Sequence, residues 1–178
     1  MGMTTEFSRV ERLDTIGGEE RQVTIEANAN EREALARRFG LVALDRLAAT
    51  FAIRRDAAAV VARGRVSASV VQSCTVTAVP LTARVEEDVA LRFVQPSGGT
   101  GGDDEIELSG EALDTIEIEG GGVDLGEAAA ETMALALDPF PRSPDAAAVL
   151  RQAGVLSEEE AGAFGALKEL KAKLEGKG

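Results

Sequence analysis

The sequence predicts an α+β fold, in which an antiparallel sheet curls toward a barrel, helices pack on one face, and a further helix ends the chain. Two observations predict this class. Alternating apolar and polar residues run through residues 66–78 and 82–94 with the period of two that half-buried strands require. Apolar residues at helical spacing, each set preceded by a residue that can cap a helix, occupy residues 31–40 and 124–137.

The length of 178 residues and a hydrophobic content of 44% suit a single domain with a real core. We expect this domain over residues 1–150, with a flexible glycine-rich loop near residues 95–104 and a helical tail over residues 151–178. The chain has no apolar run of about 18 residues, and its first residues lack the pattern of a signal peptide. Both features favour a cytoplasmic protein without membrane contact.

The N-terminal part is predicted to contain one strand followed by two helices. Residues 21–27 alternate between apolar and polar positions, as a half-buried strand does. Asn30 and Glu33 form a near capping box that starts a helix over residues 31–40. Leu, Ala and Phe residues at helical spacing predict a second helix over residues 41–53.

The middle third is predicted to be a sheet with one wet face. From Val66 onward the even positions are mostly apolar or small and the odd positions are mostly Ser and Thr, which places Cys74 on the apolar side. A second alternating run follows Pro80, so the two runs are expected to form an antiparallel pair. The short alternating stretches at residues 105–108 and 114–119 carry mostly acidic residues on their outward side.

Residues 123–144 have the clearest helical pattern of the chain. Asp124 can cap the first turn, Glu127 can close the capping box, and the Asp-Pro pair at residues 138–139 ends the helix. The proline-rich exit that follows runs extended, because a residue before proline avoids the α region. A terminal helix is expected to begin near Ser157.

The net charge of −12 is unevenly distributed along the chain. Residues 1–80 hold eleven Arg and ten acidic residues, whereas residues 81–178 hold eight basic and twenty-one acidic ones. Solubility is the simplest explanation for this excess, and a basic protein partner is the alternative. Because polyanions bind to clustered cations, we do not expect tight binding of naked RNA at physiological salt.

Cys74 is the only cysteine, and the chain has no histidine with which it could build a catalytic or metal site. Zinc needs several thiolate or imidazole ligands, and a thiol nucleophile needs a neighbouring base or cation. We therefore expect Cys74 to be a buried structural residue, and we expect no metal, cofactor or enzymatic activity. No glycine-rich phosphate loop occurs in the sequence, and the few aromatic residues, all Phe, do not alternate with basic ones.

Residues 31–41, 64–81 and 123–144, taken in this order, resemble the YceD family of large ribosomal RNA subunit accumulation proteins, in its alphaproteobacterial form. The resemblance spans most of residues 7–170. The matching residues are Gln72, Cys74, Val76, Thr77, Asp124, Leu125, Gly126, Glu131, Pro139 and Pro141. The resemblance implies a non-enzymatic factor in large-subunit ribosomal RNA accumulation and ribosome assembly, with structural roles for Gln72 and Cys74. Other branches carry a second cysteine three residues after the first, where zinc could bind; here that residue is Thr77.

Two modes of action remain open. In the first, a basic ribosomal or assembly protein binds the chain, and large-subunit ribosomal RNA is associated indirectly. The candidate surface is then the capped helix with its extended exit, Asp124, Glu131, Pro139, Pro141 and Arg142, although the prolines would also serve simply to end the helix. In the second, RNA binds directly to arginines of the predicted N-terminal helices, Arg37, Arg38, Arg54 and Arg55, for which a solvated helix face is the simpler interpretation.

Overall fold

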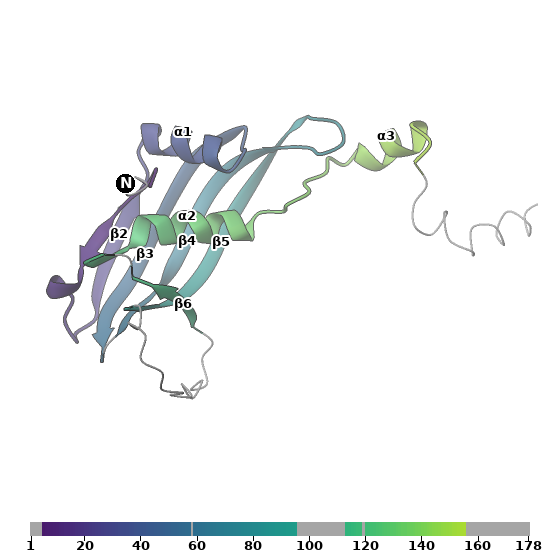
Figure 1. Cartoon of the computed structure of the whole chain (residues 1–178). Coiled ribbons are helices and arrows are strands. Elements are labelled where there is room, and N and C mark those ends of the chain that lie inside the picture. The colour runs from purple at the N-terminus through teal and green to yellow at the C-terminus, as the bar shows by residue number, and fades with distance from the viewer. Residues whose placement is uncertain (1–4, 58, 96–112, 119, 156–178) are drawn as a thin grey trace, which may run out of the picture. The chain divides into compact units, whose positions relative to one another are not determined.

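The computed structural model describes residues 5–57, 59–95, 113–118 and 120–155, which contain three α-helices and a five-stranded sheet (Figure 1). The chain divides into two compact units. The first consists of residues 1–72 and 82–139, and the second consists of residues 73–81 and 140–178.

The main sheet has the strand order β2-β3-β4-β5-β6 and is open. Its strands are β2 (Arg21–Glu26), β3 (Ala43–Asp56), β4 (Ala59–Ser73), β5 (Pro80–Val94) and β6 (Asp114–Glu117). β3 pairs antiparallel with β2 and with β4, whereas β6 runs parallel to β5. The predicted α+β class and the mostly antiparallel sheet are confirmed. The predicted curl toward a barrel is wrong, because the edge strands β2 and β6 do not pair and closure requires that they do.

The remaining elements lie before, between and after the strands of the main sheet along the chain. They are β1 (Val10–Arg12), the 3-10 helix η1 (Leu13–Thr15), β7 (Gly122–Asp124), α1 (Ala29–Arg38), α2 (Leu125–Ala136) and α3 (Ala146–Gln152). β1 and β7 form an antiparallel pair of their own. The predicted helices at residues 31–40 and 124–137 correspond to α1 and α2.

The cap of α1 differs from the predicted one. Asn28, and not Asn30, caps the helix, because its side chain accepts a hydrogen bond of 3.0 Å from the N–H of Glu31. The Glu31 carboxylate accepts one of 2.8 Å from the N–H of Asn28 in return, which completes a capping box. α2 begins after Asp124, as predicted, and its first turn donates to the Asp124 carboxylate.

The helix predicted over residues 41–53 is wrong, since these residues belong largely to strand β3. Leu47, Phe51 and Ile53 are fully buried at alternate positions, which is the period of a strand. β3 is central in the sheet and forms backbone pairs with both β2 and β4, and such pairing overrides a local helical pattern. Arg54 and Arg55 therefore lie on a strand and not on a helix.

The hydrophobic core lies between one face of the sheet and helices α1 and α2, which lie against the sheet on the same side (Figure 1). Buried side chains of both helices and of β2 to β5 belong to one cluster, which includes Leu35, Phe51, Val66, Phe93 and Met133. The alternation predicted from residue 66 onward is confirmed within β4, where Val66, Ala68 and Val70 are buried. The predicted run to residue 78 is too long, because β4 ends at Ser73 and Cys74 lies beyond the strand. The alternate positions on the other face of the sheet are largely polar.

Several predicted segments lie outside the described residues. They are the strand at residues 105–108, most of the glycine-rich loop near residues 95–104, and the terminal helix from Ser157. The strand predicted at residues 114–119 is β6. The division into a domain over residues 1–150 and a tail over residues 151–178 stays a prediction.

Candidate functional site

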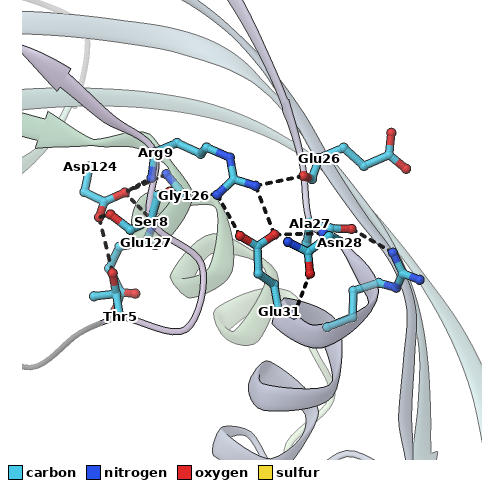
Figure 2. A network of polar contacts seen from close by, with 11 residues as sticks. Thr5, Ser8, Arg9, Glu26, Ala27, Asn28, Glu31, Asp124, Gly126 and Glu127 are labelled. Atoms are coloured by element: carbon cyan, nitrogen blue, oxygen red, sulfur yellow. Dashed lines mark hydrogen bonds and ion pairs between the residues drawn. The ribbon is translucent and has the colours of Figure 1, made fainter.

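Asp124 connects the start of α2 to the N-terminal segment of the chain (Figure 2). Its Oδ1 atom accepts hydrogen bonds from the N–H groups of Gly126 at 3.0 Å, Glu127 at 3.2 Å and Arg9 at 2.7 Å. Its Oδ2 atom accepts one of 2.6 Å from the hydroxyl of Ser8. Both carboxylate oxygens are thus bound within the chain, so Asp124 acts as a cap and a cross-link.

Arg9 connects the same N-terminal segment to α1 (Figure 2). Its guanidinium donates to both Glu31 oxygens at 2.8 and 3.0 Å and to the carbonyl of Glu26 at 3.3 Å. It also lies 4.6 Å from the ring centroid of Phe7, a cation–π contact. The hydrogen bond from Arg9 lowers the pKa of Glu31, and the effect of burial, which raises it, is smaller. The bidentate pair therefore holds Glu31 in its ionised form.

Arg38, at the end of α1, completes the connection between the two helices. It donates to both carboxylate oxygens of Glu127 on α2 at 2.9 and 2.6 Å, and to Glu6 at 3.0 Å. The hydrogen bond with Glu127 is the main cause that raises the pKa of Arg38. Glu127 was expected to close a capping box, but its carboxylate binds Arg38. Asp124, Glu31 and Arg38 thus each contact the segment Thr5–Arg9, and Arg38 also binds Glu127. We call this set of contacts the amino-terminal clamp.

Gly126 lies in the first turn of α2, where glycine is otherwise unfavourable. A Cβ atom at this position would overlap the carbonyl oxygen of Phe7 and lie 2.9 Å from the backbone nitrogen of Arg9. The close approach of the N-terminal segment therefore requires glycine here. The sequence pattern did not predict this clamp, although a glycine two residues after the cap of a helix was a signal that something packs there.

Glu131 lies on the exposed side of α2. Leu135, one turn further on, has 87% of its surface exposed, and Asp138 after the helix is also exposed. On the other side of α2, Ala129 and Met133 are fully buried. We call Glu131, Leu135 and Asp138 the outer stripe of α2.

Gln72 holds the end of this helical segment in place. Its side-chain amide donates a hydrogen bond of 2.9 Å to the carbonyl of Asp138. Pro139, the next residue, is exposed. The Gln72 contact therefore fixes the direction in which the chain leaves α2.

Cys74 belongs to the second unit and is 3% exposed. Its Sγ accepts hydrogen bonds from the N–H groups of Thr77 at 3.3 Å and Ser143 at 3.2 Å, and it lies 3.5 Å from the Ser143 hydroxyl. Burial raises the pKa of the Cys74 thiol, but the hydrogen bonds from Thr77 and Ser143 together outweigh burial and lower that pKa to about 6. One sulfur with two hydroxyl groups is a donor set that does not fit zinc. Within the described residues, no group of three or more His, Cys, Asp and Glu side chains is placed to hold a metal ion.

Pro141 and Arg142 also belong to the second unit. The carbonyl of Pro141 accepts two hydrogen bonds from Thr75, one of 2.9 Å from its N–H group and one of 3.2 Å from the Thr75 hydroxyl. These bonds hold the Pro141 backbone in place. Arg142 is exposed. Asp124, Glu131 and Pro139 lie in the first unit, so the predicted partner-binding residues are divided between the two.

The four arginines predicted as an RNA-binding set do not form one patch. Arg37 pairs with Glu33 on the outer side of α1 at 2.7 Å, and Arg38 belongs to the amino-terminal clamp. Arg54 and Arg55 are successive residues of β3 and therefore point to opposite faces of the sheet. The helical basic surface predicted from residues 31–55 does not exist, because half of that region is a strand.

The first unit has the α+β class: it contains an open, mostly antiparallel sheet and the helices α1 and α2, whose buried side chains share one core with the sheet. A model of the family described as "Large ribosomal RNA subunit accumulation protein YceD" matches residues 62–171, which is more than half of the chain. The chain belongs to the YceD family, whose name indicates a role in accumulation of the large-subunit ribosomal RNA. No curated protein and no solved structure matches the chain. Among the described residues, none of the helices has the length and apolar character needed to cross a membrane.

Proposed function

We propose that this chain is a non-enzymatic, cytoplasmic factor that supports large-subunit ribosomal RNA accumulation and ribosome assembly by binding a basic ribosomal or assembly protein. The family supplies the role in ribosomal RNA accumulation. The outer stripe of α2 supplies the surface, and the observation that carries the proposal is the 87% exposure of Leu135. A large apolar side chain so exposed, one turn after a carboxylate, can insert into a pocket of a partner.

The charge around Leu135 fits a basic partner. Glu131 lies one turn before it on α2 and is exposed, and Asp138 follows two residues after the end of the helix. An apolar anchor with a polar rim is the usual composition of a protein–protein interface. A partner with an apolar residue between lysines or arginines would match both features.

The chemistry of the chain supports binding rather than catalysis. It has no histidine, and its single thiol is buried among hydroxyl and N–H groups. Asp124 and Glu31, the carboxylates with the most hydrogen bonds, are occupied in the amino-terminal clamp. These residues hold the fold, whereas Glu131 and Leu135 are exposed on the other side of α2, where a partner can reach them.

The test is a pair of matched substitutions, Leu135→Ser on the outer stripe and Val42→Ser elsewhere. Val42 is 58% exposed and serves as the control. Both variants should keep the free energy of unfolding within about 0.5 kcal/mol of the parent. In cells that depend on this protein, Leu135→Ser should lower the ratio of large- to small-subunit ribosomal RNA and reduce co-purification of a basic protein, and Val42→Ser should do neither.

Glu131→Ala should act in the same direction as Leu135→Ser, with a smaller effect, because a charge at the edge of an interface contributes less than its apolar centre. Full complementation by the stable Leu135→Ser variant would show that the outer stripe is not the binding surface. Arg142→Ala then becomes the next variant to examine, since Arg142 is the exposed predicted residue of the second unit.

A further inference from the structure

The outer side of α2 carries one large apolar side chain among small ones. Leu135 is 87% exposed, whereas Met133 on the other side of the helix is buried in the core. Thr132 lies one turn before Leu135, and Ala134 and Ala136 flank it. In Figure 1, α2 lies against the sheet with no other described element of the first unit over its outer side. Leu135 therefore stands out from a surface of small side chains.

The small side chains around Leu135 can be buried by a partner without loss of a hydrogen bond. The Thr132 hydroxyl donates a hydrogen bond of 2.8 Å to the carbonyl of Ala128 within the same helix. Ala134 and Ala136 have no polar side-chain atoms. Because burial of a polar group is costly only where its hydrogen bond is lost, a partner can approach the backbone of α2 closely on both sides of Leu135.

The carboxyl end of α2 has no cation of its own. The last turn of α1 contains Arg37 and Arg38, whereas the last turn of α2 contains no basic residue. The carboxyl end of a helix carries a partial negative charge, which a nearby cation offsets. Glu131 and Asp138 add two carboxylates before and after this end. The end of α2 is therefore complementary to a positively charged group of a partner.

We infer that the partner presents a basic α-helix that packs across α2, with apolar side chains around Leu135 and a lysine or arginine at the carboxyl end of α2. The inference rests on the proposed function, because it describes the partner of the outer stripe. Helices pack closely when a ridge of side chains on one lies in a groove of the other. Glu131 and Leu135, four residues apart, form such a ridge, and Thr132 and Ala136 line the groove beside it. A single large side chain also fits the hole between four residues of a facing helix.

Two other occupants fit this surface less well. An extended basic segment points successive side chains to opposite sides, so it cannot surround Leu135 and fill the groove beside it at the same time. A second copy of this chain would bring another Glu131 and another Asp138 to the same surface, where like charges repel each other. A basic helix matches both the shape and the charge.

The first experiment measures binding of two labelled peptides of about 14 residues to the purified full-length protein, by fluorescence anisotropy at about 150 mM salt. Both peptides contain the same leucines, lysines and alanines. In the helical peptide the leucines recur every three or four residues, and in the alternating peptide they occupy every second position, as in a strand. The helical peptide should bind about fivefold more tightly, and Leu135→Ser should remove this preference.

The second experiment fills the groove beside Leu135. Ala136→Leu keeps a high helix propensity and adds apolar surface, so it would favour an occupant that needs only apolar contact. It should weaken binding of the helical peptide by about tenfold, because the new side chain occupies the place of the partner helix. Ala29→Leu makes the same change at an exposed residue of α1 and should alter the affinity little.

The third experiment tests the cation at the end of α2. Ala136→Lys supplies a cation from the chain itself, and Ala136→Gln supplies a side chain of similar length without charge. The helical peptide should bind about threefold more weakly to the lysine variant than to the glutamine variant. The same two substitutions at Ala29 are the control for the change in net charge. All of these positions are exposed, so the urea midpoints should stay close to that of the parent.

Equal or tighter binding of the alternating peptide would overturn the inference, as would undetectable binding of both peptides or unchanged affinity of the Ala136→Leu variant. Equal affinities of the lysine and glutamine variants would overturn the role of the cation. The two peptides compared on the parent decide the shape of the partner even if a variant does not fold. If the inference fails while Leu135→Ser still lowers the ribosomal RNA ratio in cells, the outer stripe binds a partner of another shape and the proposed function stands.

Discussion

The amino-terminal clamp and the β4–β5 pair of the sheet each contain an arginine that binds two carboxylates, and the two arginines differ in what they connect. Arg38 joins α1 to α2 and to the N-terminal segment, with partners 89 and 32 residues away in the sequence. Arg65 joins β4 to β5, two strands that are already neighbours in the sheet. The Arg38 side chain is 31% exposed and that of Arg65 is 57% exposed.

This difference separates an arginine that stabilises the fold from one that contributes little to it. In the clamp, each contact restricts chain segments that have few other connections, so loss of a contact releases a segment. Between β4 and β5, the backbone pairs of the sheet hold Arg65 in place whether or not its ion pairs form. We therefore expect substitutions in the clamp to lower stability and substitution of Arg65 to leave it nearly unchanged.

The largest loss of stability should follow Asp124→Ala, which removes the cap of α2 and the contacts with Ser8 and Arg9 together. We expect the free energy of unfolding to fall by about 2–3 kcal/mol, as measured by urea denaturation. Asp124→Asn should lose less, because Asn is an equally good cap but forms weaker hydrogen bonds than a carboxylate. An Asp124→Ala variant as stable as the parent would mean that the clamp does not hold the N-terminal segment.

A loss of about 1–3 kcal/mol should follow Gly126→Ala. Alanine favours a helix over glycine by about 1 kcal/mol, so a purely local effect would be a gain in stability. We expect a loss because the new methyl group would meet the backbone of Phe7 and Arg9. Gly18→Ala is the control, since a Cβ atom there has nothing within 4 Å. A more stable Gly126→Ala variant would show that the N-terminal segment does not pack against α2.

The cap of α1 shows how far local sequence can predict this region. Asn28 and Asn30 are each followed three residues later by a glutamate, Glu31 or Glu33, so the sequence offers two capping boxes. The structure uses the first, and the reason lies outside the helix: Arg9 binds Glu31. A contact between residues 22 apart cannot be deduced from the pattern of either segment.

The strands also differ in how well local sequence predicts them. The runs that became β4 and β5 have a period of two that is broken only at single positions such as Gln72 and Glu87, and Val66, Val70 and Phe93 are buried as that period predicts. In β3, the apolar residues Leu44 and Leu47 fit a helix as well as a strand, and only pairing with β2 and β4 decides between them. The family motifs identified Asp124 and Gly126, but the pairing partners that explain both residues lie more than 100 residues earlier in the chain.

A smaller effect, of about 1 kcal/mol, should appear in the acid dependence of stability through Glu31. Because its pKa in the folded state lies below the ordinary value of 4.5, the stability it contributes is present above that pH and is lost as the pH falls through the lower folded value. Urea denaturation between about pH 3 and pH 7 should therefore show a shallower acid loss for Glu31→Gln than for the parent. Glu33→Gln, whose side chain is 73% exposed on the same helix, should keep the full acid loss.

The smallest change in stability is expected for Arg65→Gln, and its matched partner is Arg38→Gln. Each substitution removes a guanidinium that binds two carboxylates, so a simple count of ion pairs predicts equal losses. We expect Arg38→Gln to cost about 1 kcal/mol, because Glu127 is only 20% exposed and Arg38 joins separate segments. Arg65→Gln should leave the urea midpoint unchanged within error, since the Asp88 side chain is 80% exposed and the strands pair without it. Equal midpoints for the two variants would remove the distinction between Arg38 in the clamp and Arg65 on β4, because exposure and connectivity would then have no effect on stability.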